Sequence, residues 1–88
     1  MNKMVKFKAY AKRGFNPSVM AELVTFGYGS WSLGGLNSIG MQAVILECED
    51  KDKETLIENL DIHIGISYYI ELGIPIDTSS YSEFLTKN

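Results

Sequence analysis

The sequence of 88 residues is poor in the side chains from which enzymes and metal sites are usually built. It contains one cysteine, Cys48, one histidine, His63, and one arginine, Arg13. A single cysteine excludes a disulfide within the chain and a cysteine-clustered metal site, and it is typical of proteins in a reducing compartment. We therefore expect a cytoplasmic protein that carries no metal or other cofactor.

Long apolar segments are also missing. No run approaches the length of about 18 consecutive apolar residues that a membrane-spanning helix needs, and no apolar run of signal-peptide length follows the basic N-terminus. In contrast, 45% of the residues are hydrophobic and 22% are charged, a composition that favours a packed fold over disorder. The sequence predicts one small domain that does not enter a membrane.

The few candidate catalytic and metal-binding groups have simpler structural explanations. His63 lies between two isoleucines, and only Asp61 is close enough in sequence to orient it as a general base. Cys48 is in phase with the apolar residues of a strand, which favours a buried thiol over a reactive one. The acids between Glu47 and Asp52 lack the glycine and the closing glutamate of a calcium-binding loop. We expect no catalytic residues, no metal site and no enzymatic activity.

Periodic patterns divide the chain into six elements in the order strand, helix, strand, strand, helix, strand. The expected strands span residues 5–12, 30–39, 41–49 and 66–72, and the expected helices span residues 17–26 and 53–64. Asn16 and Pro17 supply an N-cap and a first-turn proline for the first helix, and Gly34-Gly35 interrupts the second strand as a bulge or an early turn would. Each helix is expected to turn an apolar stripe to the core: Val19, Met20, Leu23, Val24 and Phe26 in the first, and Leu56, Ile57, Leu60 and Ile64 in the second.

This order predicts an α+β fold of the ferredoxin-like βαββαβ type. In that sandwich an antiparallel four-stranded sheet has its first and third strands at the centre, and two helices cover one face. The order of elements resembles that of ACT-type and other small regulatory domains, a resemblance that implies a fold and no particular site. We expect the domain to span residues 1–72. Residues 73–88 form a C-terminal extension, a tail or a short helical turn opening at a capping box over residues 80–83, that packs on the domain or on a partner.

The exposed side of the first strand is the most distinctive predicted surface. A cationic row with one aromatic projects from it, made of Lys6, Lys8, Tyr10, Lys12 and Arg13. In one interpretation the lysines pair with Glu47 and Glu49 of the neighbouring central strand. In a second they bind nucleic acid, RNA more than DNA, by neutralising phosphates while the tyrosine stacks on a base. In a third they bind an acidic protein.

The uncovered sheet face and the last strand are the other predicted contact regions. Tyr10, Ala43 and Ile45 form an apolar centre on that face, and Tyr69 is expected beside them, an arrangement that commonly marks a partner or a dimer. The last strand is expected at an edge, and it contains none of the lysines, prolines or bulge glycines that discourage strand pairing. The residues that would pair with a second copy or a target strand are Ser67, Tyr68, Tyr69 and Ile70.

The sequence therefore predicts a small non-enzymatic binding protein, a homodimer, that regulates or inhibits a protein partner. Chains of this size without catalytic residues are common among accessory proteins of bacteria and their phages, including inhibitors of host defence systems. Two alternatives stay open. One is an RNA- or DNA-binding protein that uses the basic first strand, and the other is a small-molecule-sensing regulatory domain that binds a metabolite near the glycine-rich residues 27–35.

Overall fold

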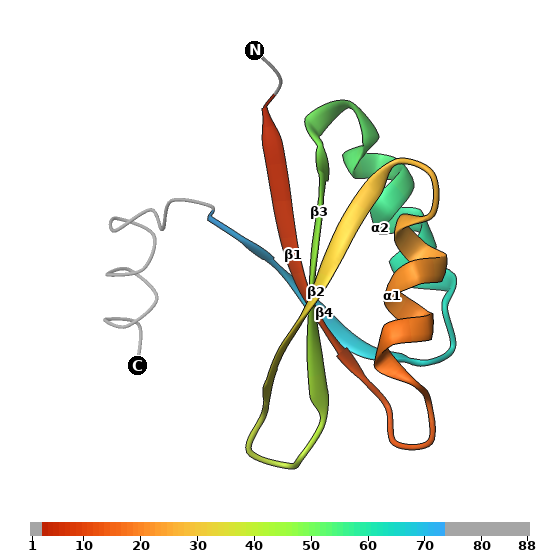
Figure 1. Ribbon diagram of the computed structural model, residues 1–88, viewed down its shortest axis with the longest axis vertical. Coiled ribbons are helices and arrows are strands. Elements are labelled where there is room, and N and C mark those ends of the chain that lie inside the picture. The colour runs from red at the N-terminus through yellow and green to blue at the C-terminus, as the bar shows by residue number, and fades with distance from the viewer. Residues whose placement is uncertain (1–2, 74–88) are drawn as a thin grey trace, which may run out of the picture.

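Six elements follow one another in the predicted order in the computed structural model, which describes residues 3–73 (Figure 1). The strands are β1 (Met4–Ala11), β2 (Gly29–Leu36), β3 (Gln42–Glu49) and β4 (Ile66–Leu72), and the helices are α1 (Pro17–Thr25) and α2 (Lys53–Ile62), with a short 3-10 helix η1 (Asp50–Asp52) before α2. The predicted α+β class is confirmed. The predicted C-terminal extension, apart from Gly73, lies outside the described residues.

One antiparallel sheet holds all four described strands, in the order β2-β3-β1-β4. The first and third strands are therefore central, as expected, and β2 and β4 are the edges. Both helices lie on the same side of this sheet, as Figure 1 shows with the sheet seen nearly edge-on. We call the side that the helices leave free the outer sheet face.

The core lies between the sheet and the two helices. β1 contributes every second residue to it, because alternate side chains of a strand point to opposite faces. The buried apolar side chains are Val5, Phe7, Ala9 and Ala11 of β1, Val44, Leu46 and Cys48 of β3, Met20, Ala21 and Val24 of α1, Leu56 and Leu60 of α2, and Ile66 of β4. Cys48 is a buried free thiol, as predicted, and burial raises its pKa.

Local signals at the turns act as the sequence predicts. The side-chain oxygen of Asn16 accepts hydrogen bonds from the backbone N–H groups of Ser18 and Val19, at 2.9 and 3.3 Å, and thereby caps the start of α1. The pairing register of β2 with β3 shifts between Leu33 and Leu36, so the two glycines between them form the predicted irregularity. Both features fix where the elements begin and how they align.

The apolar stripe of α1 is only partly buried. Met20 and Val24 each retain 2% exposure, whereas Val19, Leu23 and Phe26 retain 55%, 62% and 76%. The prediction that all five face the core is therefore wrong for three of them. The physical reason is the helix geometry: positions spaced by four and three residues share one side of a helix, and this stripe lies on the side opposite the sheet.

Candidate functional site

The outer sheet face carries part of the predicted cationic row. Lys6 lies opposite Glu47 in the register, and its Nζ is 3.4 Å from Glu47 Oε2. Lys8 instead lies opposite Ile45, with its Nζ 5.6 Å from the ring centre of Tyr10. The predicted cross-strand pairing is thus present for one lysine. Exposed pairs of this kind contribute about 0–1 kcal/mol each, so they influence the surface charge more than the stability.

The other predicted acid does not meet a lysine of β1. Glu49 lies opposite Met4 in the register, and its Oε2 is 3.6 Å from the Nζ of Lys51 in η1. Lys12 and Arg13 follow the end of β1 in an exposed loop. Arg13 donates a hydrogen bond of 3.3 Å to the backbone oxygen of Ile39, which ties that loop to the β2-β3 turn. The cationic row is therefore split between the strand and the loop.

Tyr69 of β4 points the opposite way from the prediction. Tyr68, not Tyr69, lies on the outer sheet face, where its ring stacks on Tyr10 with 4.6 Å between the ring centres. Tyr69 lies on the helix side, edge-on to Phe7, and its hydroxyl donates to Asp61 of α2. That hydrogen bond raises the pKa of Tyr69. The prediction that Tyr69 belongs to the uncovered face is therefore wrong.

An irregularity in the pairing of β1 with β4 explains the reversal. Tyr10 pairs with Tyr68, but the next residue, Ala11, pairs with Ile66. Ser67 is skipped, and a strand that skips one residue turns all later side chains to the other face. β4 is an edge strand, as predicted, yet this bulge is one of the devices that discourage pairing with another chain. It weakens the expectation that residues 67–70 add a strand from a second copy.

The glycine-rich segment has a packing role. A side-chain carbon added to Gly29 would lie 2.7 Å from the backbone oxygen of Glu47, and one added to Gly34 would lie 3.1 Å from Cβ of Ala43. Ile45, which the sequence predicts as a contact residue, is half-buried on the outer sheet face beside that second glycine. These glycines let β2 approach β3 closely.

A second apolar surface, which the sequence does not predict, lies on the outer side of the helices. It consists of Val19, Leu23, Phe26, Ile62 and Ile64, all more than half exposed, and we call it the helical patch. One signal was available in the sequence: the apolar residues of α1 spread around most of the helix, wider than one core-facing stripe requires. The expected burial of Ile64 is wrong, because α2 ends at Ile62 and the chain leaves the core there.

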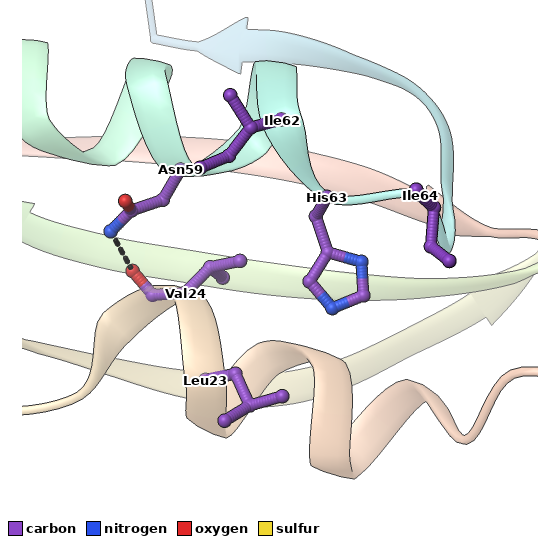
Figure 2. A pocket seen from close by; sticks show the side chains of 6 residues that line it. All are labelled: Leu23, Val24, Asn59, Ile62, His63 and Ile64. Carbon is purple, nitrogen blue, oxygen red and sulfur yellow. Dashed lines mark hydrogen bonds between the residues drawn. The ribbon is translucent and has the colours of Figure 1, made fainter.

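A groove separates α1 from α2 within this patch (Figure 2). It has a volume of about 340 Å³ and is lined by Leu23, Val24, Asn59, Ile62, His63 and Ile64. The side-chain amide of Asn59 donates to the backbone oxygen of Val24, at 3.2 Å, and to the hydroxyl of Tyr28, at 2.8 Å. This amide links the two helices across the groove and satisfies a carbonyl at the end of α1.

His63 stands at the end of α2, with its ring pointing toward α1 in Figure 2. Its Nδ1 accepts a hydrogen bond of 2.9 Å from the backbone N–H of Gly65, so the neutral ring carries its proton on Nε2. The nearby Asp61 is engaged by Tyr69, and the edge of the ring meets Phe15 with 6.4 Å between the ring centres. These contacts hold the histidine as a wall of the groove.

A second hollow adjoins the groove on the other side of α1. It has a volume of about 290 Å³ and is lined by Ser18, Val19, Glu22, Leu23 and Trp31. The indole N–H of Trp31 donates to Glu22 Oε2 at 3.0 Å. Because Leu23 lines both hollows, it forms the ridge between them, and the helical patch is a furrowed rather than a flat surface.

Acidic residues outnumber basic ones on the two helices. α1 contains Glu22 and no lysine or arginine, and α2 contains Glu54, Glu58 and Asp61. The one cation of α2, Lys53, lies 2.9 Å from Glu71 of β4 and is held there. The helix layer is therefore apolar and negative, whereas the lysines of β1 lie on the opposite side of the sheet.

Neither a metal-binding cluster nor a relative points to a particular chemistry. Within residues 3–73 no three His, Cys, Asp or Glu side chains come together in a way that would hold a metal ion. Neither described helix has the length and the apolar composition that crossing a membrane requires. Comparison of the chain with protein-family models, with curated proteins and with solved structures found no match.

Proposed function

We propose that this chain is a protein-binding domain, without catalytic activity, whose partner packs on the helical patch. The observation that carries the proposal is the double apolar character of α1. One stripe, with Met20 and Val24, packs in the core, and a second, with Val19, Leu23 and Phe26, faces outward. Apolar residues that extend well beyond the core-facing side of a helix are typical of a helix that packs against a second surface.

The position of the exposed residues supports the same proposal. Single exposed apolar side chains are ordinary on protein surfaces, but contiguous ones along a furrow are typical of interaction sites. Leu23, Ile62 and Ile64 line one groove together, and Val19 and Leu23 line the hollow beside it. The patch thus offers depressions into which the side chains of a partner can pack.

The strand order supports a finer description of the domain. β1 and β3 are central, and each helix connects two strands that are not neighbours in the sheet. These two features favour the ferredoxin-like split βαβ arrangement. That fold hosts many unrelated roles, so the role is inferred here from the surface. We further propose that the domain regulates or inhibits a cytoplasmic partner, as accessory proteins of bacteria or phages do. The sequence also leads us to propose that it forms a homodimer.

Affinity capture with matched variants tests the proposed function. The full chain is compared with a variant that carries Leu23→Lys and Ile62→Lys, and with a control that carries Leu33→Lys and Leu36→Lys, which adds the same two charges at exposed apolar residues of β2. We expect the wild type and the control to retain a nuclease-resistant protein partner that the double variant loses. A partner retained equally by all three chains would contradict the proposed site.

The outer sheet face supports a second candidate function, nucleic-acid binding. The stacked pair of Tyr10 and Tyr68 lies on that face with Lys8 above the Tyr10 ring, and aromatic rings beside lysines suit the binding of single-stranded RNA. Such binding weakens steeply with salt. A titration of single-stranded RNA at several salt concentrations tests it, and the absence of a salt-dependent affinity would rule it out.

A further inference from the structure

We propose that the partner contacts the helical patch with a basic amphipathic helix. This inference rests on the proposed function and adds the chemistry of the partner. Three properties of the patch support it: the shape of the groove between α1 and α2, the distribution of apolar side chains along it, and the sign of the charges around it.

The shape fits a helix more closely than a strand or a flat surface. Two helices with an open groove between them form the kind of surface on which an amphipathic helix lays its apolar face, with anchors at intervals of three and four residues. The groove and the adjoining hollow lie on either side of the ridge at Leu23. Successive anchors of one incoming helix can pack on the two sides of that ridge.

The charges around the patch select a basic partner. Glu58 lies four residues, about one helical turn, before Ile62 and so on the same side of α2, and Glu54 lies one turn further back. Both are exposed, and no cation of residues 3–73 forms an ion pair with either of them. Glu22 lines the adjoining hollow of the patch. Lysines and arginines that flank the apolar anchors of a partner would meet these acids.

The same charges disfavour two other occupants. A second copy of this chain, bound through the same patch with two-fold symmetry, would bring like surfaces together, so that acids would face acids. An anionic lipid surface attracts basic segments and not acidic ones. The helical patch is therefore better suited to a foreign basic helix than to self-association or to attachment at a membrane.

Three synthetic peptides of equal length test the inference on the full chain. In the first, leucines stand at positions i, i+3, i+4 and i+7 and lysines elsewhere. The second has the same leucines and glutamates elsewhere, and the third has the composition of the first with the leucines scattered. Binding is followed by the fluorescence of Trp31, the one tryptophan of the chain, which lines the hollow beside Leu23, and by chemical-shift mapping of the backbone.

We expect the basic amphipathic peptide to bind at least tenfold more tightly than the other two and to shift resonances of α1 and of the end of α2. Ile62→Lys should weaken this binding at least tenfold, and Leu36→Lys should leave it unchanged. Glu58→Lys should lower the affinity for the basic peptide and raise the affinity for the acidic peptide by about threefold each, because an exposed charge has a modest effect. Equal binding of the acidic peptide, binding that maps to the sheet, or no binding would overturn the inference.

The failure of this inference is distinguishable from failure of the proposed function. If affinity capture recovers a partner that depends on Leu23 and Ile62 while no basic peptide binds, the patch binds proteins but not by this chemistry. If neither the capture nor the peptides depend on those residues, the helical patch is not the binding surface. A dimer that Ile62→Lys converts to a monomer would show that a second copy occupies the patch.

Discussion

Two residues of α1, Leu23 and Met20, should respond to substitution in opposite ways if the outer stripe of this helix exists for binding and not for folding. Met20 is 2% exposed and Leu23 is 62% exposed. We predict that Met20→Ala destabilises the domain strongly and that Leu23→Lys hardly does so. Lysine suits the test because its helix propensity is close to that of leucine, so that the substitution changes mainly the apolar surface.

The expected magnitudes follow from the burial of the two side chains. Truncation of a buried methionine to alanine lowers the free energy of unfolding by about 2–5 kcal/mol, because a cavity adds to the lost burial. Complete burial of a leucine contributes roughly 1.5–3 kcal/mol, and Leu23 hides less than half of its surface. Its loss should therefore lower the free energy of unfolding by about 1 kcal/mol or less, and the aliphatic stem of the lysine reduces even that.

Urea unfolding followed by circular dichroism measures both changes on the full chain. Leu36→Lys on β2, similarly exposed at 67%, serves as the matched control and should also have a small effect. If Leu23→Lys destabilises the protein as much as Met20→Ala, then the outer stripe is part of an intramolecular core. That result would remove both the proposed function and the inferred partner.

Three further outcomes test other parts of the structure. Asn16→Ala should lower the free energy of unfolding by about 1 kcal/mol because α1 loses its N-cap, and Asn16→Asp, which keeps an acceptor oxygen, should lose much less in the same urea assay. A double-mutant cycle with Tyr10→Ala and Tyr68→Ala should give a coupling energy of about 0.5–1.5 kcal/mol, and additive effects would show that the rings do not stack. Stability should fall as the pH rises above 9.0, the ordinary pKa of a cysteine thiol. The pKa values of Cys48 and Tyr69 are raised in the folded chain, so these two groups lose their protons at lower pH in the unfolded chain than in the folded one. High pH therefore favours the unfolded chain. A free energy of unfolding that stays constant in urea titrations from neutral to strongly alkaline pH would contradict this.

Much of the fold is readable from the sequence because its signals are local. The alternation along β1 depends only on the two-residue period of a strand, and the start of α1 depends on one side chain and one proline. The pairing of Lys6 with Glu47 follows once the two central strands are taken as antiparallel neighbours. In each case the physical cause lies within a few residues of its effect or follows directly from the order of strands.

The face of Tyr69 and the helical patch are not readable in this way. No glycine or proline at Ser67 predicts the bulge there, yet the bulge reverses the face of every later residue of β4. The apolar period of α1 gives the direction of each side chain but not how much of the helix meets the sheet. Leu23 is exposed because it lies on the side of α1 opposite the sheet, and which side meets the sheet is decided by tertiary packing.

The central position of β1 has a consequence for how the chain folds. Both of its partners are distant in the sequence: Met4 pairs with Glu49, and Lys6 pairs with Leu72. Contacts of such long sequence separation close large loops, which places mixed α/β domains between fast-folding helical bundles and slow-folding β proteins. During synthesis β1 emerges before both of its partners, β3 and β4, and β4 is the last of the four described strands. A nascent chain that has not yet reached β4 keeps one edge of its main strand unpaired, and in that interval it is most exposed to aggregation.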